Sequence, residues 1–398
     1  MNKRTDICHF YFLLIFAIGM AFFGCTSPFN PEIPPSNSVL VVEASITNEV
    51  KQHQIFLSRS TQNSDGPELE EGAEVTVMAS NGQEYRFSES AVGIYTSTSA
   101  FSAQPNVSYQ LMITRSNGSS YTSEEVVLPQ TSQIERVYAE RVTTETGLDG
   151  VQIFVDGFDP TGNSIYYKYE YEETYKIIVP NWVPDQLVVV SEENMVVGVV
   201  PRQEEERICF ATNSSNSIII TQTSGAGEDR VSGFEVQFIN RENFIISHRY
   251  SILVKQHVIS REAFNFYEKL KDFSGSESLF SQSQPGFIDG NISSLSNEEE
   301  RVVGIFEVSS VSEQRIFFNY TDLFPNEDLP AFVDECKRIN ISPQDPNLFN
   351  SVKSNSVSFV GTVTDPSTGA LLEYVLVPKV CGDCTELGNA EVPSFWEE

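Results

Sequence analysis

Basic side chains are scarce in this sequence, with 25 lysines and arginines against 55 aspartates and glutamates among 398 residues, so the formal net charge is −30 at pH 7. A surface of this sign repels phosphate backbones and anionic lipid headgroups, which disfavours nucleic-acid binding and peripheral membrane docking. Solubility is the simplest reason for the acidity. Asp156, Asp159 and Asn163 could share a calcium ion, but turn chemistry explains these three residues more simply.

Catalytic motifs are missing as well. The sequence has no Walker loop, no GxGxxG after a strand, no GxSxG elbow and no HExxH. His53, His248 and His257 are isolated from one another, and a histidine of this kind is far more often a surface or core residue than a catalytic base. We therefore expect no enzyme activity, cofactor or metal. A hydrolase whose catalytic groups are dispersed along the chain is the least favoured alternative.

Long hydrophobic runs are absent except near the N-terminus, where Lys3 and Arg4 precede an apolar run over residues 10–23. A helix needs roughly 20 apolar residues to cross a bilayer core, so this run is too short for a comfortable membrane span. A basic start followed by a short apolar stretch is typical of a secretory signal. The sequence therefore predicts export.

The end of the apolar run, Phe22-Phe23-Gly24-Cys25, resembles the bacterial lipobox. In that motif a small residue precedes a cysteine that becomes diacylated and then forms the mature N-terminus. Gly24 and Cys25 fit the motif, whereas Phe22 and Phe23 depart from its usual leucine and small residue. We expect residues 1–24 to be a lipoprotein signal peptide and Cys25 to be lipidated. An ordinary signal peptide with a chance cysteine is the alternative.

Residues 25–37 show no hydrophobic periodicity and are rich in proline, serine and asparagine. Such a composition is typical of a flexible tether, as a lipid-anchored domain requires. The rest of the chain is long enough for two domains of ordinary size.

Cysteines are few, and once Cys25 and the signal segment are set aside only Cys209, Cys336, Cys381 and Cys384 remain. In an oxidising compartment these four thiols would make two disulfides, with three possible pairings. Because Gly382-Asp383 forms a turn, a bridge across it would be tight, so Cys381 and Cys384 are expected to pair with the two distant cysteines. A zinc site made by all four thiolates is the alternative.

Residues 38–130 show the alternating pattern of short, half-buried strands separated by turn signals such as Asn81-Gly82 and Asn117-Gly118. Six or seven such strands predict an immunoglobulin-like β-sandwich. The expected strands are 39–46, 54–58, 73–78, 84–88, 109–114 and 121–128.

Residues 131–398 are predicted to form a second, larger β-sandwich. Within its long strand candidate 165–179, Tyr167, Tyr169 and Tyr171 share one face. Such a row could bind sugar rings by stacking, although packing in a core is commoner. Further strands are expected at 133–143, 151–155, 207–210, 217–222, 234–238, 249–258, 302–311, 315–318, 358–362 and 373–377.

One segment breaks the β pattern. Ser260 can cap a helix that continues to about Phe273, with Ala263, Phe264, Tyr267 and Leu270 on one side. We expect an inserted helix at 260–273 that packs on the sandwich, with contact to a partner as the alternative.

Several long segments together resemble a family of Bacteroidota outer-membrane lipoproteins, domain-of-unknown-function family 4249. They are LVVEASITNE, FDPTGNSIYYKYEYEETYKI, RYSILVKQHVISREAFNFYEKLK, VSSVSEQRIFF and the closing CGDCTELGNAEVPSFW, in addition to the candidate lipobox. The resemblance implies an outer-membrane lipoprotein commonly encoded next to a TonB-dependent receptor, with no established enzymatic activity. No ligand-binding residue carries over from it.

The leading hypothesis is thus an outer-membrane lipoprotein that is an accessory or binding component of a TonB-dependent nutrient uptake system, on either the periplasmic or the outer face. Its expected partners are the receptor and, through the lipid anchor, the membrane. A cell-surface adhesin or glycan-binding module that uses the sandwich loops or the tyrosine row is the second hypothesis.

Overall fold

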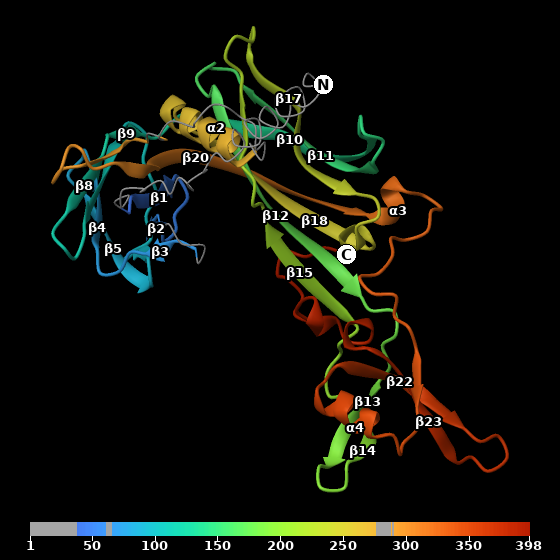
Figure 1. Ribbon diagram of the computed structural model, residues 1–398. Coiled ribbons are helices and arrows are strands. Elements are labelled where there is room, and N and C mark those ends of the chain that lie inside the picture. Colours follow the sequence, from blue (N-terminus) through green and yellow to red (C-terminus); the bar gives the residue numbers. More distant parts are fainter. Residues whose placement is uncertain (1–37, 61–65, 276–287, 289) are drawn as a thin grey trace, which may run out of the picture. The chain divides into compact units, whose positions relative to one another are not determined.

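The structure, a computed structural model, describes residues 38–60, 66–275, 288 and 290–398 (Figure 1). The candidate signal peptide, Cys25 and the tether to residue 37 lie outside the described residues. Strands dominate the described part and helices are few, which confirms the predicted mainly β class. None of the helices in the described part is both long and apolar enough to span a membrane.

Short strands between residues 40 and 127 form most of the first sheet and surround one hydrophobic core. In β1, Val42, Ala44 and Ile46 point into this core while Glu43 points outward, as the two-residue period of a strand requires. The strands are β1 (Leu40–Thr47), β2 (Gln54–Arg59), β3 (Glu68–Leu69), β4 (Glu74–Ala79), β5 (Glu84–Ala91), β6 (Ile94–Ser97), β7 (Ser108–Thr114), β8 (Ser120–Ser123) and β9 (Val126–Val127).

Residues 38–130 supply most of this sheet but not all of it. Its hydrogen-bonded order is β20-β1-β2-β6-β5-β4-β7-β8-β19, so β19 (Ile292–Ser294) and β20 (Val302–Asn319) come from much later in the chain. The Asn291 side chain links the two ends of this order, because its amide donates to the Phe306 carbonyl and its carbonyl accepts from the Phe306 N–H. The first sandwich is therefore completed by strands from beyond residue 290.

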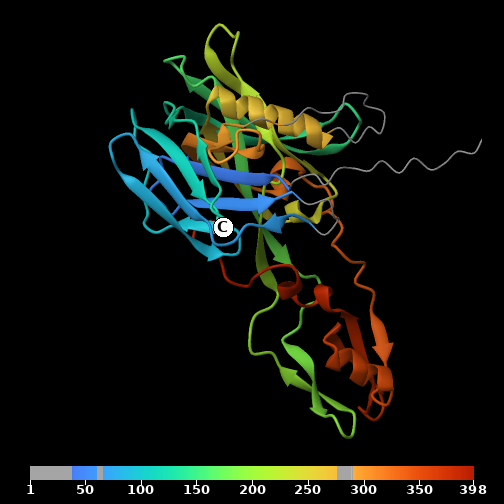
Figure 2. The same ribbon diagram turned by 60° about the vertical axis from the view of Figure 1, so that its left-hand side comes forward.

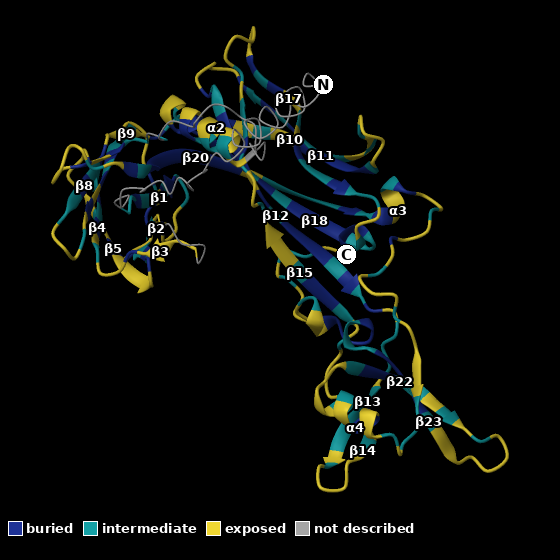
Figure 3. Cartoon of the chain, viewed as in Figure 1, coloured by how far each residue is buried: buried dark blue, intermediate teal, exposed yellow. Residues whose placement is uncertain are grey.

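The long strand β20 belongs to both sandwiches. Its first half pairs in parallel with β1, from Leu40↔Val302 to Thr47↔Ser309. Its second half pairs antiparallel with β18 (Arg249–Val258), from Val258↔Ser310 to Arg249↔Asn319. Figure 3 shows most of β20 buried. The two segments expected at 302–311 and 315–318 are thus one continuous strand.

The second sandwich consists of two sheets with a core between them. One sheet has the order β10-β11-β17, with β10 (Gln133–Thr143), β11 (Asp149–Asp159) and β17 (Asp229–Asn240). The other contains β18, the second half of β20, β12 (Tyr166–Ile178), β15 (Ile208–Ser214) and β16 (Ile219–Gln222). The rings of Tyr169 and Phe234 stack across the core with centroids 5.1 Å apart.

The predicted helix is present as α2 (Arg261–Gly275). Its first turn is capped by Ser260, whose Oγ accepts the Ala263 N–H at 3.1 Å. Ala263, Phe264 and Phe266 are buried with Ile305 of β20 in a small core of their own. The helix therefore packs on β12, β16 and β20, as Figures 1 and 2 show.

A smaller group of elements has its own core around Leu348, Phe359, Tyr374 and Leu376. It contains the two-stranded sheet of β13 (Asp185–Ser191) and β14 (Val196–Pro201), the sheet β21-β23-β22 and one helix. The remaining bounds are β21 (Ile339–Ile341), α4 (Pro346–Lys353), β22 (Val357–Thr364), β23 (Leu371–Pro378), α3 (Tyr320–Leu323), η1 (Phe244–Ile246), η2 (Lys379–Cys381) and η3 (Cys384–Glu386).

The closing segment packs on the outer face of the second sandwich. Phe317 precedes the core residue Phe318 and so points away from the core, towards Trp396 at 5.8 Å between ring centroids. Trp396 also contacts Phe210 at 4.8 Å, and the Arg315 guanidinium lies 3.6 Å over the Phe395 ring. This packing accounts for the aromatic end of the closing motif.

Candidate functional site

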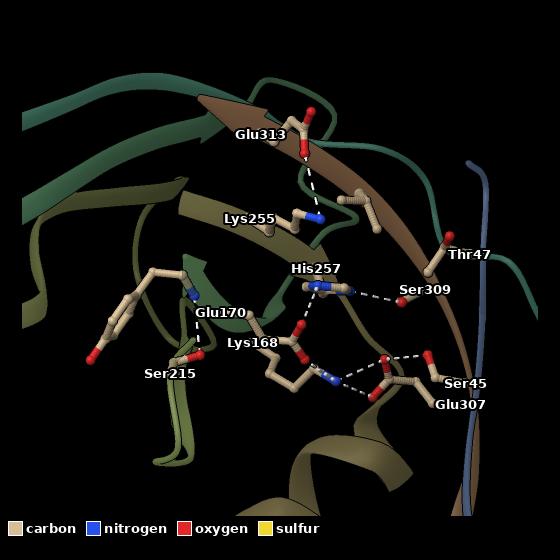
Figure 4. Close-up of polar contacts among 12 residues, drawn as sticks. Ser45, Thr47, Lys168, Glu170, Ser215, Lys255, His257, Glu307, Ser309 and Glu313 are labelled. Atoms are coloured by element: carbon tan, nitrogen blue, oxygen red, sulfur yellow. Dashed lines mark hydrogen bonds and ion pairs between the residues drawn. The ribbon is translucent and has the colours of Figure 1, made fainter. Parts of the chain in front are cut away.

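A cluster of polar side chains, most of them buried, lies where β20 changes its pairing partner from β1 to β18. We call it the polar junction and define it as Lys168, Glu170, His257, Tyr267, Glu307 and Ser309. Figure 4 labels each of these residues except Tyr267. Strands β12, β18 and β20 and helix α2 each contribute. Gly304 permits the close approach of β1 to β20, because a Cβ at its φ of +144° would lie 2.0 Å from the Val42 carbonyl oxygen.

The centre of the junction is the ion pair between Lys168 and Glu307. The Lys168 ammonium lies 3.1 Å from both Glu307 carboxylate oxygens, and the Glu307 side chain has no exposed surface. The ammonium also lies 3.4 Å from the Tyr267 hydroxyl and 4.8 Å from the centre of its ring. Ser45 of β1 donates to Glu307 at 3.4 Å. The pair thus joins both sandwiches and the helix.

Each charge of the pair stabilises the other. Burial by itself would lower the pKa of Lys168, but Glu307, together with Tyr267 and Glu170, more than offsets burial and raises that pKa well above its ordinary value. Burial would raise the pKa of Glu307, but the charge of Lys168, together with the hydrogen bonds from Lys168 and Tyr267 and the neighbouring His257, lowers it overall. Both groups are therefore ionised at neutral pH, and the Lys168 amine is not available as a nucleophile.

His257 lies between a serine and a carboxylate. Its Nδ1 is 3.1 Å from the Ser309 Oγ, and its Nε2 is 3.5 Å from a carboxylate oxygen of Glu170 (Figure 4). The contact with His257 lowers the pKa of Glu170 well below its ordinary value against the effect of burial, and Lys168 adds to this. Serine, histidine and carboxylate occur in hydrolytic triads, but Ser309 is fully buried and no substrate could reach its hydroxyl in this conformation.

A polar pocket of about 350 Å³ opens beside the junction. Glu43 reaches it from the first sandwich and Tyr267 from α2, so parts distant in sequence line one hollow. Its remaining wall residues are Lys168, Tyr169, Glu170, Tyr171, Glu172, Ser214, Ser215, Ser217, Ile218, Ile219 and Lys255. Carboxylates, hydroxyls and amines of this kind suit a small polar ligand.

The tyrosine row predicted as a possible sugar-binding surface lies in the core. Tyr167 and Tyr169 are each 1% exposed and Tyr171 is 9% exposed. The Tyr167 hydroxyl donates to Asp229 at 2.8 Å, and that of Tyr169 to Gln256 at 3.0 Å. Interior packing therefore explains the row. The hypothesis that these rings stack on sugars is wrong, because all three side chains are buried.

The four candidate cysteines form two disulfides. Cys209 is bonded to Cys384 and Cys336 to Cys381, with Cα–Cα distances of 5.5 and 5.6 Å. Cys381 and Cys384 thus pair with the distant cysteines and not with each other, as predicted. With these four sulfurs bonded in pairs, the alternative zinc site made by all four thiolates is not formed. Asp334, Cys336 and Cys381 lie close together, but both of these cysteines belong to one disulfide.

The possible calcium trio is a turn. The Asp159 carboxylate accepts the N–H groups of Thr161, Asn163 and Ser164 at 2.8–3.2 Å and the Thr161 hydroxyl at 2.7 Å. Asp156 instead pairs with Arg136 at 2.9 Å. The carboxylates of Asp156 and Asp159 are therefore already occupied by hydrogen-bond donors.

The polar junction was not predicted from the sequence. Lys168 and Glu170 lie on the face of β12 opposite the tyrosines, where a charged strand face normally indicates solvent. The available signal was Glu307, a single acid within the apolar run Val302–Val308. A lone charge inside a buried strand requires a buried partner of opposite charge.

The family model described as "Domain of unknown function (DUF4249)" matches residues 26–315. The matched span contains every residue of the polar junction and ends within β20, so the closing motif lies outside it. Comparison with curated proteins finds no match to the chain. Because the family model covers more than half of the sequence, the chain belongs to the DUF4249 family.

Proposed function

We propose that the chain is a lipid-anchored outer-membrane protein that serves as an accessory or binding component of a TonB-dependent nutrient uptake system. The basic start, the short apolar run and Gly24-Cys25 support an acylated N-terminus. Acyl chains on Cys25 would hold the folded part at a membrane surface, where it meets neighbouring proteins and passing solutes.

The observation that carries the proposal is the pair of disulfides. Disulfides persist in the periplasm and at cell surfaces and are rare in the reducing cytosol. They therefore support the export that the N-terminal sequence predicts. The receptor partner is supported by the resemblance to Bacteroidota lipoproteins, which are commonly encoded beside such receptors.

Binding is favoured over catalysis by the chemistry of the polar junction. Lys168 is held as an ammonium group by Glu307, and Ser309 is fully buried. The neighbouring pocket, in contrast, presents accessible carboxylates and hydroxyls that can hydrogen-bond a ligand.

Co-purification tests the receptor partnership. Tagged full-length protein is recovered from detergent-solubilised outer membranes, and the proteins bound to it are identified by mass spectrometry. We expect a TonB-dependent receptor in near-equal amount, and we expect the control variant Cys25→Ala to leave the membrane fraction and to recover much less of it. Repeated absence of any such receptor from the wild-type sample would refute the partnership.

Glycan binding is the second candidate, and the polar pocket now supports it in place of the tyrosine row. Tyr267 is only partly buried, and Glu170 is half exposed, so both can reach a ligand in the pocket. A glycan array would show binding that Glu170→Gln weakens and the distant exposed variant Lys337→Met does not. Identical array profiles for wild type and Glu170→Gln would exclude this pocket.

A further inference from the structure

A second pocket, of about 330 Å³, lies at the far end of β12 and is separate from the polar junction. Its walls come from the end of β12, from the segment around η1 and from the segment after α3. We call it the β12-end pocket. The lining residues are Lys176, Ile177, Ile178, Val179, Pro180, Arg207, Phe244, Ser247, His248, Leu329, Pro330 and Phe332.

Most of these walls are apolar. Phe244 and Phe332 meet edge to face with ring centroids 6.2 Å apart, and Leu329 is 49% exposed at the opening. Burying such surface favours an apolar ligand by about 25 cal/mol for each Å² removed from water. The walls therefore suit the hydrocarbon part of a ligand.

The polar groups of the β12-end pocket are basic, although the whole chain carries a net charge of −30. Lys176 and Arg207 supply permanent positive charge. Burial, with a contribution from Lys176, lowers the pKa of His248, so this ring is neutral at pH 7. Among the described residues, no acidic one lines this pocket, although Glu398 of an adjoining hollow pairs with Lys176. The charged side chains of the pocket wall are thus opposite in sign to the protein as a whole.

A carboxylate already contacts this basic group. The Lys176 ammonium lies 2.8 and 2.9 Å from the two carboxylate oxygens of Glu398. Glu398 lines an adjoining hollow of about 380 Å³, which shares Lys176, Ile178, Ser247, His248 and Leu329 with the pocket. The Glu398 side chain is 69% exposed, so it can leave Lys176 without exposing a buried group. Its position shows where a ligand carboxylate can bind.

We propose that the β12-end pocket binds an amphiphilic anion, a carboxylate attached to an apolar chain, with the carboxylate replacing Glu398 at Lys176. The apolar chain packs against Phe244, Leu329 and Phe332. Arg207, also in the pocket wall, supplies a second positive charge. This ligand class goes beyond the proposed function and does not depend on a receptor partner.

Titration calorimetry with octanoate, octan-1-ol and octylammonium tests the proposal, because the three probes share one chain and differ in charge. Full-length detergent-solubilised protein should bind octanoate, bind octan-1-ol more weakly and bind octylammonium weakest of all. Equal affinity for the three probes, or no heat with octanoate, would overturn the proposal.

Variants locate the site. Lys176→Met keeps the length of the side chain and removes its charge, so octanoate affinity should fall about tenfold, as for the loss of one charge-assisted hydrogen bond. Glu398→Gln removes the competing carboxylate and should raise octanoate affinity several-fold. Leu329→Asp, at an exposed position, should abolish binding without unfolding the protein.

Lys255→Met is the matched control, because Lys255 lines the polar pocket and not the β12-end pocket. It should leave octanoate affinity unchanged. An equal loss in Lys255→Met and Lys176→Met, or a loss of affinity in Glu398→Gln, would contradict the assignment. Receptor co-purification is measured independently of octanoate binding. A negative outcome in one experiment therefore does not change how the other is interpreted.

Discussion

Lys168 and Glu307 lie in an interior where neither charge is tolerated alone. We predict that Lys168→Met lowers the free energy of unfolding by about 3–5 kcal/mol, because it leaves the Glu307 carboxylate buried without a counter-charge. Urea denaturation followed by circular dichroism measures this loss.

Two variants serve as controls for that prediction. Lys168→Met combined with Glu307→Leu removes both charges and should recover most of the lost stability. Lys255→Met breaks a partly exposed contact of 3.8 Å with Glu313 and should change the free energy of unfolding by less than about 1 kcal/mol. If the double variant is no more stable than Lys168→Met, the pair does not act as a compensated unit.

The same pair predicts a dependence of stability on pH. Because the pKa of Glu307 is lowered in the folded protein, its ionised form stabilises the fold. This contribution is complete above the unfolded carboxyl pKa of about 4.3 and is lost as the pH falls through the lower folded-state pKa. Lowering the pH below about 4 should therefore destabilise the wild type more steeply than the double variant. Parallel pH profiles for the two proteins would contradict this prediction.

Residue patterns predicted the core better than the candidate site. The two-residue period of Tyr167, Tyr169 and Tyr171 correctly indicated one packed face, because burial follows strand period directly. The polar junction was not predictable in the same way. Lys168, His257 and Glu307 are far apart in sequence, and only the strand register places them together.

At the scale of elements, the disulfide between Cys209 and Cys384 fixes the closing segment to β15. It closes a loop over a sequence separation of 175 residues. We predict that Cys209→Ser combined with Cys384→Ser lowers the free energy of unfolding by about 2–5 kcal/mol, measured by urea denaturation under oxidising conditions.

The Cys336–Cys381 bond provides the comparison, since its sequence separation is only 45 residues. A disulfide that closes a shorter loop restricts the unfolded chain less and so stabilises the fold less. Cys336→Ser combined with Cys381→Ser should therefore lower the free energy of unfolding by a smaller amount. A double variant of Cys209 and Cys384 as stable as wild type would show that packing of Trp396 alone holds the closing segment.

Secondary-structure elements were predicted correctly where the spacing of apolar residues and a capping residue indicated the same element. The helix at 260–273 is present as α2 because Ser260 caps it and its apolar side chains recur at helical spacing. The hairpin of β13 and β14 was not predicted. Its apolar runs, Leu187–Val190 and Val196–Val200, show no alternation, and the Glu192–Asn194 turn contains no glycine or proline.

At the scale of the whole molecule, the first sandwich needs β19 and β20, which come from residues beyond 290, to complete its strand order. β1 pairs in parallel with residues 302–309, and β8 pairs with β19 at Ile292–Ser294. We predict that a fragment of residues 38–130 does not fold, because both ends of its strand order would be unpaired. Amide dispersion in its NMR spectrum measures this, and a well-dispersed spectrum would show an independent domain.

The domain boundary predicted between residues 38–130 and 131–398 rests on the linker signals near Pro129. Such signals reflect only the local composition of the chain. Residues Val39–Glu398 cluster as one compact unit, because β19 and β20 complete the first sheet. Parallel pairing of β1 with a strand more than 250 residues later leaves no local signal, so sequence pattern alone could not reveal it.

Mass spectrometry of the N-terminal peptide from native membranes tests the proposed anchoring most directly. We expect a mature protein that begins at an acylated Cys25 and is recovered in the membrane fraction. An unmodified Cys25 thiol in a soluble protein that retains residues 1–24 would contradict it.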